Sequence, residues 1–493
     1  MSRESHTETR AADAVAVPFA AIVLAMLPAV LDQTILATAL PVIAGDLGSL
    51  SDLSWVVTAY VIAAAASTPL WGKLGDRHGR KRLLEVSLVV FVGASALCGA
   101  AQDITQLIVT RLVQGAAAGG LMTLAMAAVG DLVAPRERGR YQGYIAAAFA
   151  GATVVGPLIG GVLVDHASWR WVFLVNLPLG IAALTGLALR LPAPPSERPA
   201  RPLDAAGAAL LAAATSALML TCILGGERYA WDSSAILALI ATTVALTGAL
   251  VVRERRATDP IVPLQLLRTP AVAVASSALF LATAALFSVT VFVPLFLQTT
   301  TGAGPTEAGL LLIPAMLAIT VSTTLSGRSI ARTGRYKRFP IVGLALMAAA
   351  LVLLAALAGD PSQVATGIGL ALFGLGFGMV TQVLVLAVQN SVDRRELGVA
   401  TATTGFFRAL GGAIGAAVLG AVFAAQAGAR ASQPSGDALR SDIIDAVQAV
   451  FLVAAPLAAI ALIVVMRLPE LPLQARAGAA VPPNAETAPA TRG

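Results

Sequence analysis

The chain has 493 residues, of which 57% are hydrophobic and only 12% are charged, and its mean hydropathy is +0.82. Soluble domains carry about 25% charged residues, so this composition excludes a soluble globular protein, a disordered chain and a disulfide scaffold. The net charge of +6 and the pI of about 9.8 would favour nucleic-acid binding in a soluble protein, whereas membrane proteins carry basic loops on one side.

The apolar residues gather in runs that indicate an integral membrane protein. A helix needs about 20 mostly apolar residues to cross a bilayer, and the first such run is full length and follows a mixed-charge segment, which disfavours a cleavable signal sequence. We expect an all-α protein with fourteen transmembrane helices. These fall at 18–40, 54–74, 83–101, 104–128, 141–164, 169–190, 205–224, 232–252, 271–297, 305–327, 339–358, 363–388, 400–425 and 446–466.

The spans form two sets of six with two further helices between them. The loop after the sixth span is rich in proline, and the segment after the last span is rich in alanine, proline and threonine, which indicates disorder. The predicted organisation is a cytoplasmic N-terminal tail (1–17), an N-terminal six-helix bundle (18–190), a cytoplasmic linker (191–204), two additional transmembrane helices (205–252), a cytoplasmic connector (253–270), a C-terminal six-helix bundle (271–466) and a disordered cytoplasmic tail (467–493).

Basic residues mark one side of the membrane. Most of the 33 Lys and Arg residues fall in alternate loops, on the side that holds both chain ends. The positive-inside rule then places both termini in the cytoplasm and predicts a multi-pass protein of the cell inner (plasma) membrane. Its basic loops face anionic lipid, and no nucleic-acid partner is expected. The exceptions are four outer arginines and two within spans: Arg170, Arg228, Arg430, Arg440, Arg111 and Arg408.

A basic loop sequence occurs twice. Gly72–Arg82 joins the second and third spans, and Gly327–Lys337, which keeps its glycines and several basic residues, joins the tenth and eleventh. Two such copies on one side predict the parallel repeats of a two-bundle transporter, with a substrate path between the halves. The alternative is two unrelated basic loops with turn glycines. Because Ala331 stands where the first copy has Asp76, a latch between the halves is expected from the first loop only.

The first loop supplies the candidate cytoplasmic gate. Its acidic residue can pair with a helix N-terminus or with a basic group of the other half, and its basic residues also anchor the topology. The candidate gate residues are Gly72, Asp76, Arg77, Gly79, Arg80 and Lys81.

Two charged residues lie inside spans at similar depth. Asp32 is about 12 Å below the outer edge of its span and Arg111 is about 10 Å below, at 1.5 Å per helical residue. A carboxylate at that depth costs about 2.5–3.5 kcal/mol on insertion scales and faces a cavity or a partner. We expect Asp32 to alternate between a proton and a cationic substrate while Arg111 shifts its pKa. The alternative is a static buried ion pair that orients the bundle.

The fifth span and three polar side chains supply the remaining candidates. Small residues permit close backbone approach and a proline disrupts a helix locally; packing alone is the alternative. The fifth-span residues are Gly151, Gly156, Pro157, Gly160 and Gly161. Candidates for the substrate path are Gln33, Gln114 and Arg408. The arginine either contacts substrate, couples the C-terminal bundle or snorkels toward the interface.

Six sequence motifs resemble those of the major facilitator superfamily, and three of them resemble its fourteen-span drug:proton antiporter branch. The resemblance implies two bundles of six helices with two extra helices between them. It also implies proton coupling through Asp32 and Arg111, and antiport through the fifth-span motif. The superfamily motifs are GKLGDRHGRKRLL (Gly72–Leu84), LIVTRLVQGAAAG (Leu107–Gly119) and GATVVGPLIGG (Gly151–Gly161); those of the branch are LDQTILATALP (Leu31–Pro41), WRWVFLVNLPLG (Trp169–Gly180) and GFFRALGGAIG (Gly405–Gly415).

The expected function follows from this resemblance and from missing motifs. The sequence has no phosphate-binding loop and its three histidines are scattered, so an enzyme or an ATP-driven pump is disfavoured. We expect a drug:proton antiporter that expels hydrophobic, cationic or neutral compounds by alternating access and gives drug or antibiotic resistance. It would use the proton gradient, need no cofactor or metal, and function as a monomer. The alternatives are a dedicated exporter of one metabolite or lipid, and a non-transporting membrane sensor or partner-binding subunit.

Overall fold

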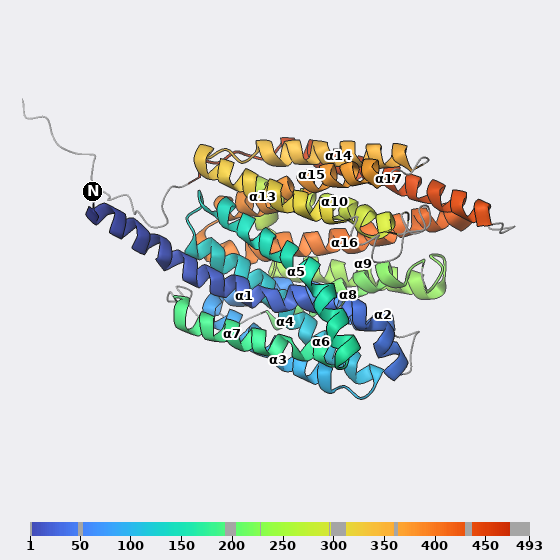
Figure 1. Ribbon diagram of the computed structural model, residues 1–493, viewed down its shortest axis with the longest axis horizontal. Helices are drawn as coiled ribbons and strands as arrows, with labels where there is room; N and C mark the ends of the chain where they lie inside the picture. Colours follow the sequence, from blue (N-terminus) through green and yellow to red (C-terminus); the bar gives the residue numbers. More distant parts are fainter. Residues whose placement is uncertain are drawn as a thin grey trace, which may run out of the picture.

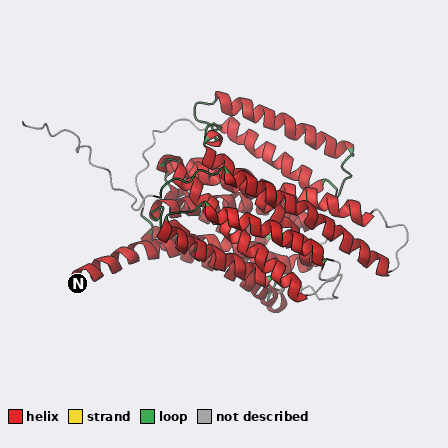
Figure 2. Ribbon diagram, turned by 90° about the horizontal axis from the view of Figure 1, so that it is seen from above, coloured by secondary structure: helices red, strands yellow, loops and turns green. Residues whose placement is uncertain are grey.

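The computed structural model describes residues 2–47, 53–192, 204–226, 228–294, 296, 312–358, 363–428 and 436–473. Within these ranges the protein is a bundle of long helices that run roughly side by side along the longest axis of the molecule (Figures 1 and 2). Thirteen described segments are long and apolar enough to cross a bilayer. A further helix of 21 residues occupies the place of the tenth expected span, and the fold therefore agrees with the fourteen-helix expectation.

The first half of the chain forms six helical spans. The first helix begins at Ser2, so the segment expected as an N-terminal tail continues the span as helix, and the sixth span is broken at Val175. Gly79, whose φ of +89° suits only glycine well, turns the chain between the second and third helices. The elements are α1 (Ser2–Leu47), α2 (Leu53–His78), α3 (Arg80–Ala100), α4 (Ile104–Leu132), α5 (Arg138–His166), α6 (Trp171–Leu174) and α7 (Asn176–Arg190).

Two further helices follow as a hairpin, α8 (Ala205–Leu224) and α9 (Ser234–Arg256). The Asp204 carboxylate accepts a hydrogen bond from the Gly207 N–H and so caps α8. It also binds the Arg253 guanidinium, which lowers the pKa of Asp204. The hairpin is therefore closed at its base, and the connector that follows is held to α2 by an ion pair between Asp259 and Lys73. Most of the expected linker, 193–203, lies outside the described residues.

The second half forms the other bundle. Its first helix, α10 (Pro270–Phe287), continues into the π-helical segment η2 (Ser288–Phe292). The expected span at 305–327 is described only from Leu312 onward, and its helix ends where Gly334 adopts a φ of +71°. The expected tail is described only to residue 473. The remaining helices are α13 (Ile313–Thr333), α14 (Arg338–Leu357), α15 (Gln363–Ser391), α16 (Leu397–Gly428) and α17 (Gly436–Met466).

Each half buries its own apolar core, as expected for two bundles. One large cluster of buried side chains contains only residues of the second half and its connector, such as Phe373 and Phe451. Two other clusters contain only residues of the first half, such as Phe91 and Trp169. A small cluster joins Met219 of α8 to α2 and α16, so the inserted hairpin packs against both halves.

Candidate functional site

An ion pair inside the first bundle joins α1 to α4. The side chains of Asp32 and Arg111 are 0% and 1% exposed, and Oδ2 of the carboxylate lies 2.5 Å from Nη1 of the guanidinium. Arg111 also donates through Nε to the Val56 carbonyl (3.1 Å), and its guanidinium carbon lies 4.3 Å from the ring centroid of Tyr60. The structure thus brings together the two charges that the sequence placed at similar depth.

Two amide side chains complete the coordination of this carboxylate. Oδ1 of Asp32 accepts hydrogen bonds from Nε2 of Gln114 (2.9 Å) and Nδ2 of Asn176 (3.2 Å). Both amides also donate to the Ser95 hydroxyl, at 3.1 Å and 2.9 Å. All of these side chains are buried. We call Asp32, Arg111, Gln114, Asn176 and Ser95 the buried network.

The buried network changes the role expected for Gln114 and the substrate access expected for Asp32. Gln114 was placed on the substrate path, but it is fully buried and bound to Asp32. A cationic substrate has no access to Asp32 in this conformation, because the described partners enclose the carboxylate. Gln33 is exposed, one residue from Asp32. Asn176 and Ser95 were not expected from the sequence. Asn176 could have been found, because it is an amide side chain within an apolar span and within the motif Trp169–Gly180.

The ion pair matters for helix packing because it is buried. Protonation of Asp32 would remove the only described counter-charge of Arg111 and leave a buried cation unpaired. An unpaired buried charge costs several kcal/mol, so loss of the pair would destabilise the packing of Arg111 and of α4, which carries it. The Asp32–Arg111 ion pair therefore joins α1 to α4 through two opposite charges.

The glycine motif of α5 packs against α1 close to this network. A Cβ atom at Gly156 would lie 2.0 Å from Oγ1 of Thr34, and one at Gly160 would lie 2.3 Å from Oγ1 of Thr38. These two glycines are therefore required for contact between the helices. A Cβ at Gly151 or Gly161 would meet open space instead, and Pro157 is exposed within the helix. The close approach thus depends on two of the five motif residues.

Near the end of α2, where the basic loop to α3 begins, Asp76 joins the two bundles. Its carboxylate accepts hydrogen bonds from the backbone N–H groups of Gly398 (2.9 Å) and Val399 (2.8 Å), at the start of α16. A negative charge is favourable at a helix N-terminus. Arg80 donates to Asp76 (2.7 Å) and to the Arg394 carbonyl (2.9 Å). This end, which also holds the basic loops, is called the basic end below.

The other candidate gate residues serve different purposes. Gly72 lets α2 approach α16, because its Cβ would lie 2.7 Å from the Gly398 carbonyl oxygen. Lys81 donates to the Ala188 carbonyl (2.9 Å) within its own bundle, and Gly79 shapes the turn. Arg77 is half-buried near the end of α2. Asp131, near the end of α4, forms an ion pair with Arg80.

A second contact between the bundles was missed by the sequence analysis. Arg136 donates through Nε to the Ala331 carbonyl (2.8 Å) and through Nη2 to the Arg332 carbonyl (3.0 Å), at the end of α13. A cation is favourable at a helix C-terminus. The expectation of a one-sided latch is therefore wrong, because a residue outside the repeated loop supplies the second side.

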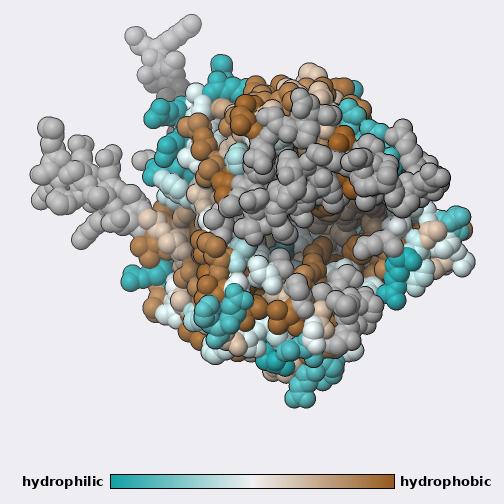
Figure 3. All heavy atoms as spheres, turned by 45° about the vertical axis from the view of Figure 1, so that its right-hand side comes forward, coloured by the Kyte–Doolittle hydropathy of each residue, from teal (hydrophilic) through white to brown (hydrophobic). Residues whose placement is uncertain are grey.

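The described hydrogen bonds between the two bundles all lie toward the basic end, so the bundles are closed there. They involve Asp76, Arg80, Arg136, Arg138, Gln389 and Arg394. Figure 3, in which the right-hand side of Figure 1 comes forward, shows a hollow with apolar side chains along part of its border. Arg408 lies on α16, exposed. The conformation is thus closed at one end and hollowed toward the other.

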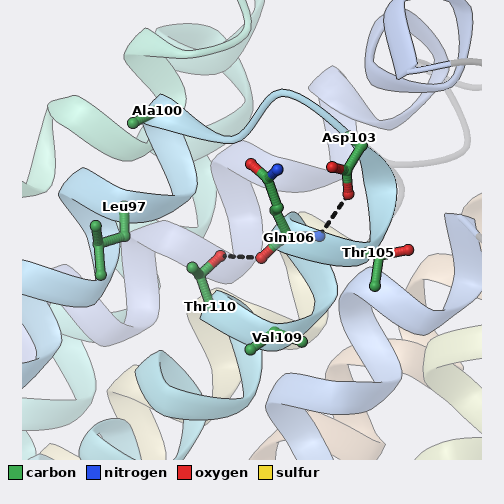
Figure 4. Close-up of a pocket in the computed structure, with 7 residues that line it drawn as sticks. All are labelled: Leu97, Ala100, Asp103, Thr105, Gln106, Val109 and Thr110. Atoms are coloured by element: carbon green, nitrogen blue, oxygen red, sulfur yellow. Dashed lines mark hydrogen bonds between the residues drawn. The ribbon is translucent and has the colours of Figure 1, made fainter.

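Two further cavities carry no comparable arrangement. A depression of about 530 Å³ lies where α3 meets α4 (Figure 4). Two of its polar side chains bind backbone: the Asp103 carboxylate accepts a hydrogen bond from the Gln106 N–H, and the Thr110 hydroxyl donates to the Gln106 carbonyl. Another of about 630 Å³ lies between the connector, Lys73 and the start of α16. In the part of the chain that the structure describes, no group of three or more His, Cys, Asp or Glu side chains is placed to hold a metal ion.

Comparisons with known proteins identify the fold and its relatives. The sequence profile of the Major Facilitator Superfamily matches residues 22–416. An uncharacterized MFS-type transporter of Mycobacterium tuberculosis, Rv1877, is 41% identical over 82% of this chain, which spans 59% of that relative. The multidrug transporter protein MdtP of Bacillus subtilis is 37% identical over 83% of this chain and 75% of its own length.

Solved structures of low sequence identity share the fold. The human organic anion transporter MFSD10 (TETRAN) superposes with a TM-score of 0.67 at 17% identity, over 92% of this chain and 99% of its own. The proton:xylose symporter XylE superposes with a TM-score of 0.64 at 15% identity, over 93% of this chain and 97% of its own.

Proposed function

Because the chain belongs to the major facilitator superfamily of membrane transporters, we propose that it is a proton-coupled exporter of the fourteen-span drug:proton antiporter branch. It would expel small hydrophobic or amphipathic compounds by alternating access, with the proton gradient as its energy source, no cofactor and a monomer as the working unit. We further propose that it resides in the cell inner membrane with both termini in the cytoplasm, because the basic loops share one end with the N-terminus.

The observation that carries this proposal is the buried Asp32–Arg111 pair. A titratable carboxylate inside a bilayer is expensive and marks an ion or proton pathway in many transporters. Here its only described counter-charge is an arginine, which stays protonated at all working pH values. A proton taken up by Asp32 therefore changes the charge of the network by one unit. That change supplies the differential energy that a switch between two conformations requires.

The closed basic end supports alternating access. If the substrate path opens toward the opposite end in this conformation, the exporter must also adopt one in which the contacts of Asp76 and Arg136 are broken. Export as the direction is supported by the names of relatives, which include a multidrug transporter and an efflux pump, FUS6, of Gibberella moniliformis at 33% identity.

A dedicated exporter of one metabolite is the second candidate. The observation that favours it is a relative at 34% identity named as the transporter of the acurin A biosynthesis cluster of Aspergillus aculeatus. A panel of structurally different compounds separates the two candidates, since a dedicated exporter would carry one compound and reject the rest.

The proposal is tested by dye accumulation in an efflux-deficient bacterial host. Cells that express the protein should accumulate less of several dyes, and a protonophore should abolish the difference. Asp32→Asn should accumulate dye like the empty host while the protein remains in the membrane at normal level. Asp165→Asn is the matched control, because Asp165 is exposed at the end of α5 and its loss should change nothing. Full efflux by Asp32→Asn would refute proton coupling through this residue.

A further inference from the structure

Arg408 is a charged side chain inside the transport domain that the buried network does not use. It lies on α16, about 16 Å from the start of the helix at 1.5 Å per residue, which is near the middle of a bilayer about 30 Å thick. The residue lies deep within the protein, yet its surface is exposed. It therefore borders an internal space.

The neighbours of α16 show which space this is. On one side Gly411 meets the backbone of Phe280 on α10, where a Cβ would lie 2.1 Å from the carbonyl oxygen. On another side Ala409 and Ala413 join the apolar cluster formed with Met219 of α8. With 3.6 residues per turn, Arg408 belongs to neither of these faces. It faces away from α8, between the sides that contact α10 and α2.

This third face is open. Gly405 and Gly412 stand one turn before and one turn after Arg408, and so share its side of the helix. A Cβ atom at Gly405 would meet only Thr68 of α2, and one at Gly412 only Thr283 of α10, each at 3.7 Å. Since α2 and α10 belong to different bundles, the open face of α16 looks into the space between the halves.

No described carboxylate forms an ion pair with this guanidinium. Among the residues that the structure describes, Arg408 makes no hydrogen bond, ion pair or ring contact. Among the described residues, Asp32 and Arg111 also lie deep in a bundle, and they neutralise each other. The described charges near the path therefore sum to one positive charge, and a guanidinium offers a planar fork of donors that matches an oxyanion.

We propose that Arg408 is a substrate-binding residue and that the compounds transported are amphipathic organic anions. A carboxylate or similar oxyanion of the substrate would pair with Arg408, and the apolar remainder would lie against the apolar border of the hollow. This replaces the cationic class expected from the sequence, because Asp32 is enclosed while the accessible charge is positive. The inference rests on the proposed transport function, but binding tests it independently.

The test measures binding by the full-length protein in nanodiscs of zwitterionic lipid. Three fluorescent probes share one body and differ in charge: 1-pyrenebutyrate, 1-pyrenebutanol and 1-pyrenebutylamine. The wild-type protein should bind the carboxylate at least about tenfold more tightly than the amine, as expected for a charge-assisted pair. Arg408→Gln should lose this preference, and Arg408→Lys, which keeps the charge, should retain most of it. Arg228→Gln, on the outer turn of the α8–α9 hairpin, is the matched control and should bind like wild type.

The outcomes separate this inference from the proposed function. Equal carboxylate affinity in Arg408→Gln and wild type, or a wild-type preference for the amine, overturns the inference. Retention of the preference in Arg408→Lys shows that a loss in Arg408→Gln is not misfolding. Transport of the same probes into proteoliposomes under a pH gradient is then measured. Arg408-dependent binding without any proton-driven transport refutes the proposed function but supports the anion site. Proton-driven transport that Arg408→Gln does not alter supports the proposed function but refutes the anion site.

Discussion

The contact of Asp76 with α16 gives the sharpest prediction about conformational switching. Asp76→Ala removes the acceptor of two backbone N–H groups, at 2.9 Å and 2.8 Å, and the partner of Arg80 at 2.7 Å. A charge-assisted hydrogen bond contributes about 1.5–3 kcal/mol. Because water can reach the N–H groups once the bundles separate, we expect a net loss of about 2–4 kcal/mol from the closed basic end. That loss corresponds to a shift of roughly 30- to 1,000-fold in the ratio of closed to open molecules.

The assay is a distance measurement between spin labels at the basic end. Labels at Glu137, before α5, and Thr333, at the end of α13, lie on different bundles and are both exposed; Cys98 and Cys222 are replaced by alanine. Wild type should give mainly the short distance. Asp76→Ala should gain a longer distance, and Asp165→Ala should not. An unchanged distribution in Asp76→Ala would refute the idea that this contact holds the end closed.

Two other substitutions test contacts that the structure reveals. Arg136→Gln removes the cation from the end of α13 and should shift the same distances toward the open form, by less than Asp76→Ala because partly exposed cations at helix ends contribute only about 0.3–1 kcal/mol. Gly156→Ala should lower the thermal unfolding temperature and reduce transport, since overpacking costs about 1–3 kcal/mol, whereas Gly151→Ala, which meets open space, should change neither.

A specific result would contradict each of these two predictions. A shift in Arg136→Gln larger than that in Asp76→Ala would make the α13 contact the main latch. Equal unfolding temperatures for Gly156→Ala and Gly151→Ala, measured on detergent-purified protein, would show that α1 and α5 are not in tight contact at this point.

Much of the fold was accessible from the sequence because lipid imposes simple rules. Span length, hydropathy and the placement of basic loops predicted a fourteen-helix protein with two bundles, and charge rarity singled out Asp32 and Arg111. These arguments depend on position along a helix, which a rise of 1.5 Å per residue converts directly into depth. The domain boundaries, the orientation of the termini and the antiporter branch stay predictions.

What the sequence did not predict depends on rotation about helix axes and on contacts between distant segments. Gln114 was expected on the substrate path, but its helix turns it toward Asp32. Asn176 and Ser95 come from helices whose relative rotation only the structure fixes. Arg136 was indistinguishable from an ordinary topology-setting arginine, since its partners are backbone carbonyls, which every sequence has.

The central claim, coupling of export to a proton through Asp32, is tested most directly by proton movement. Purified protein is placed in liposomes that contain a pH-sensitive dye, and the three pyrene probes are added in turn. The account predicts a change of internal pH that depends on a probe, disappears in Asp32→Asn and persists in Asp165→Asn. Probe transport without any proton movement, or equal proton movement in Asp32→Asn, would contradict it.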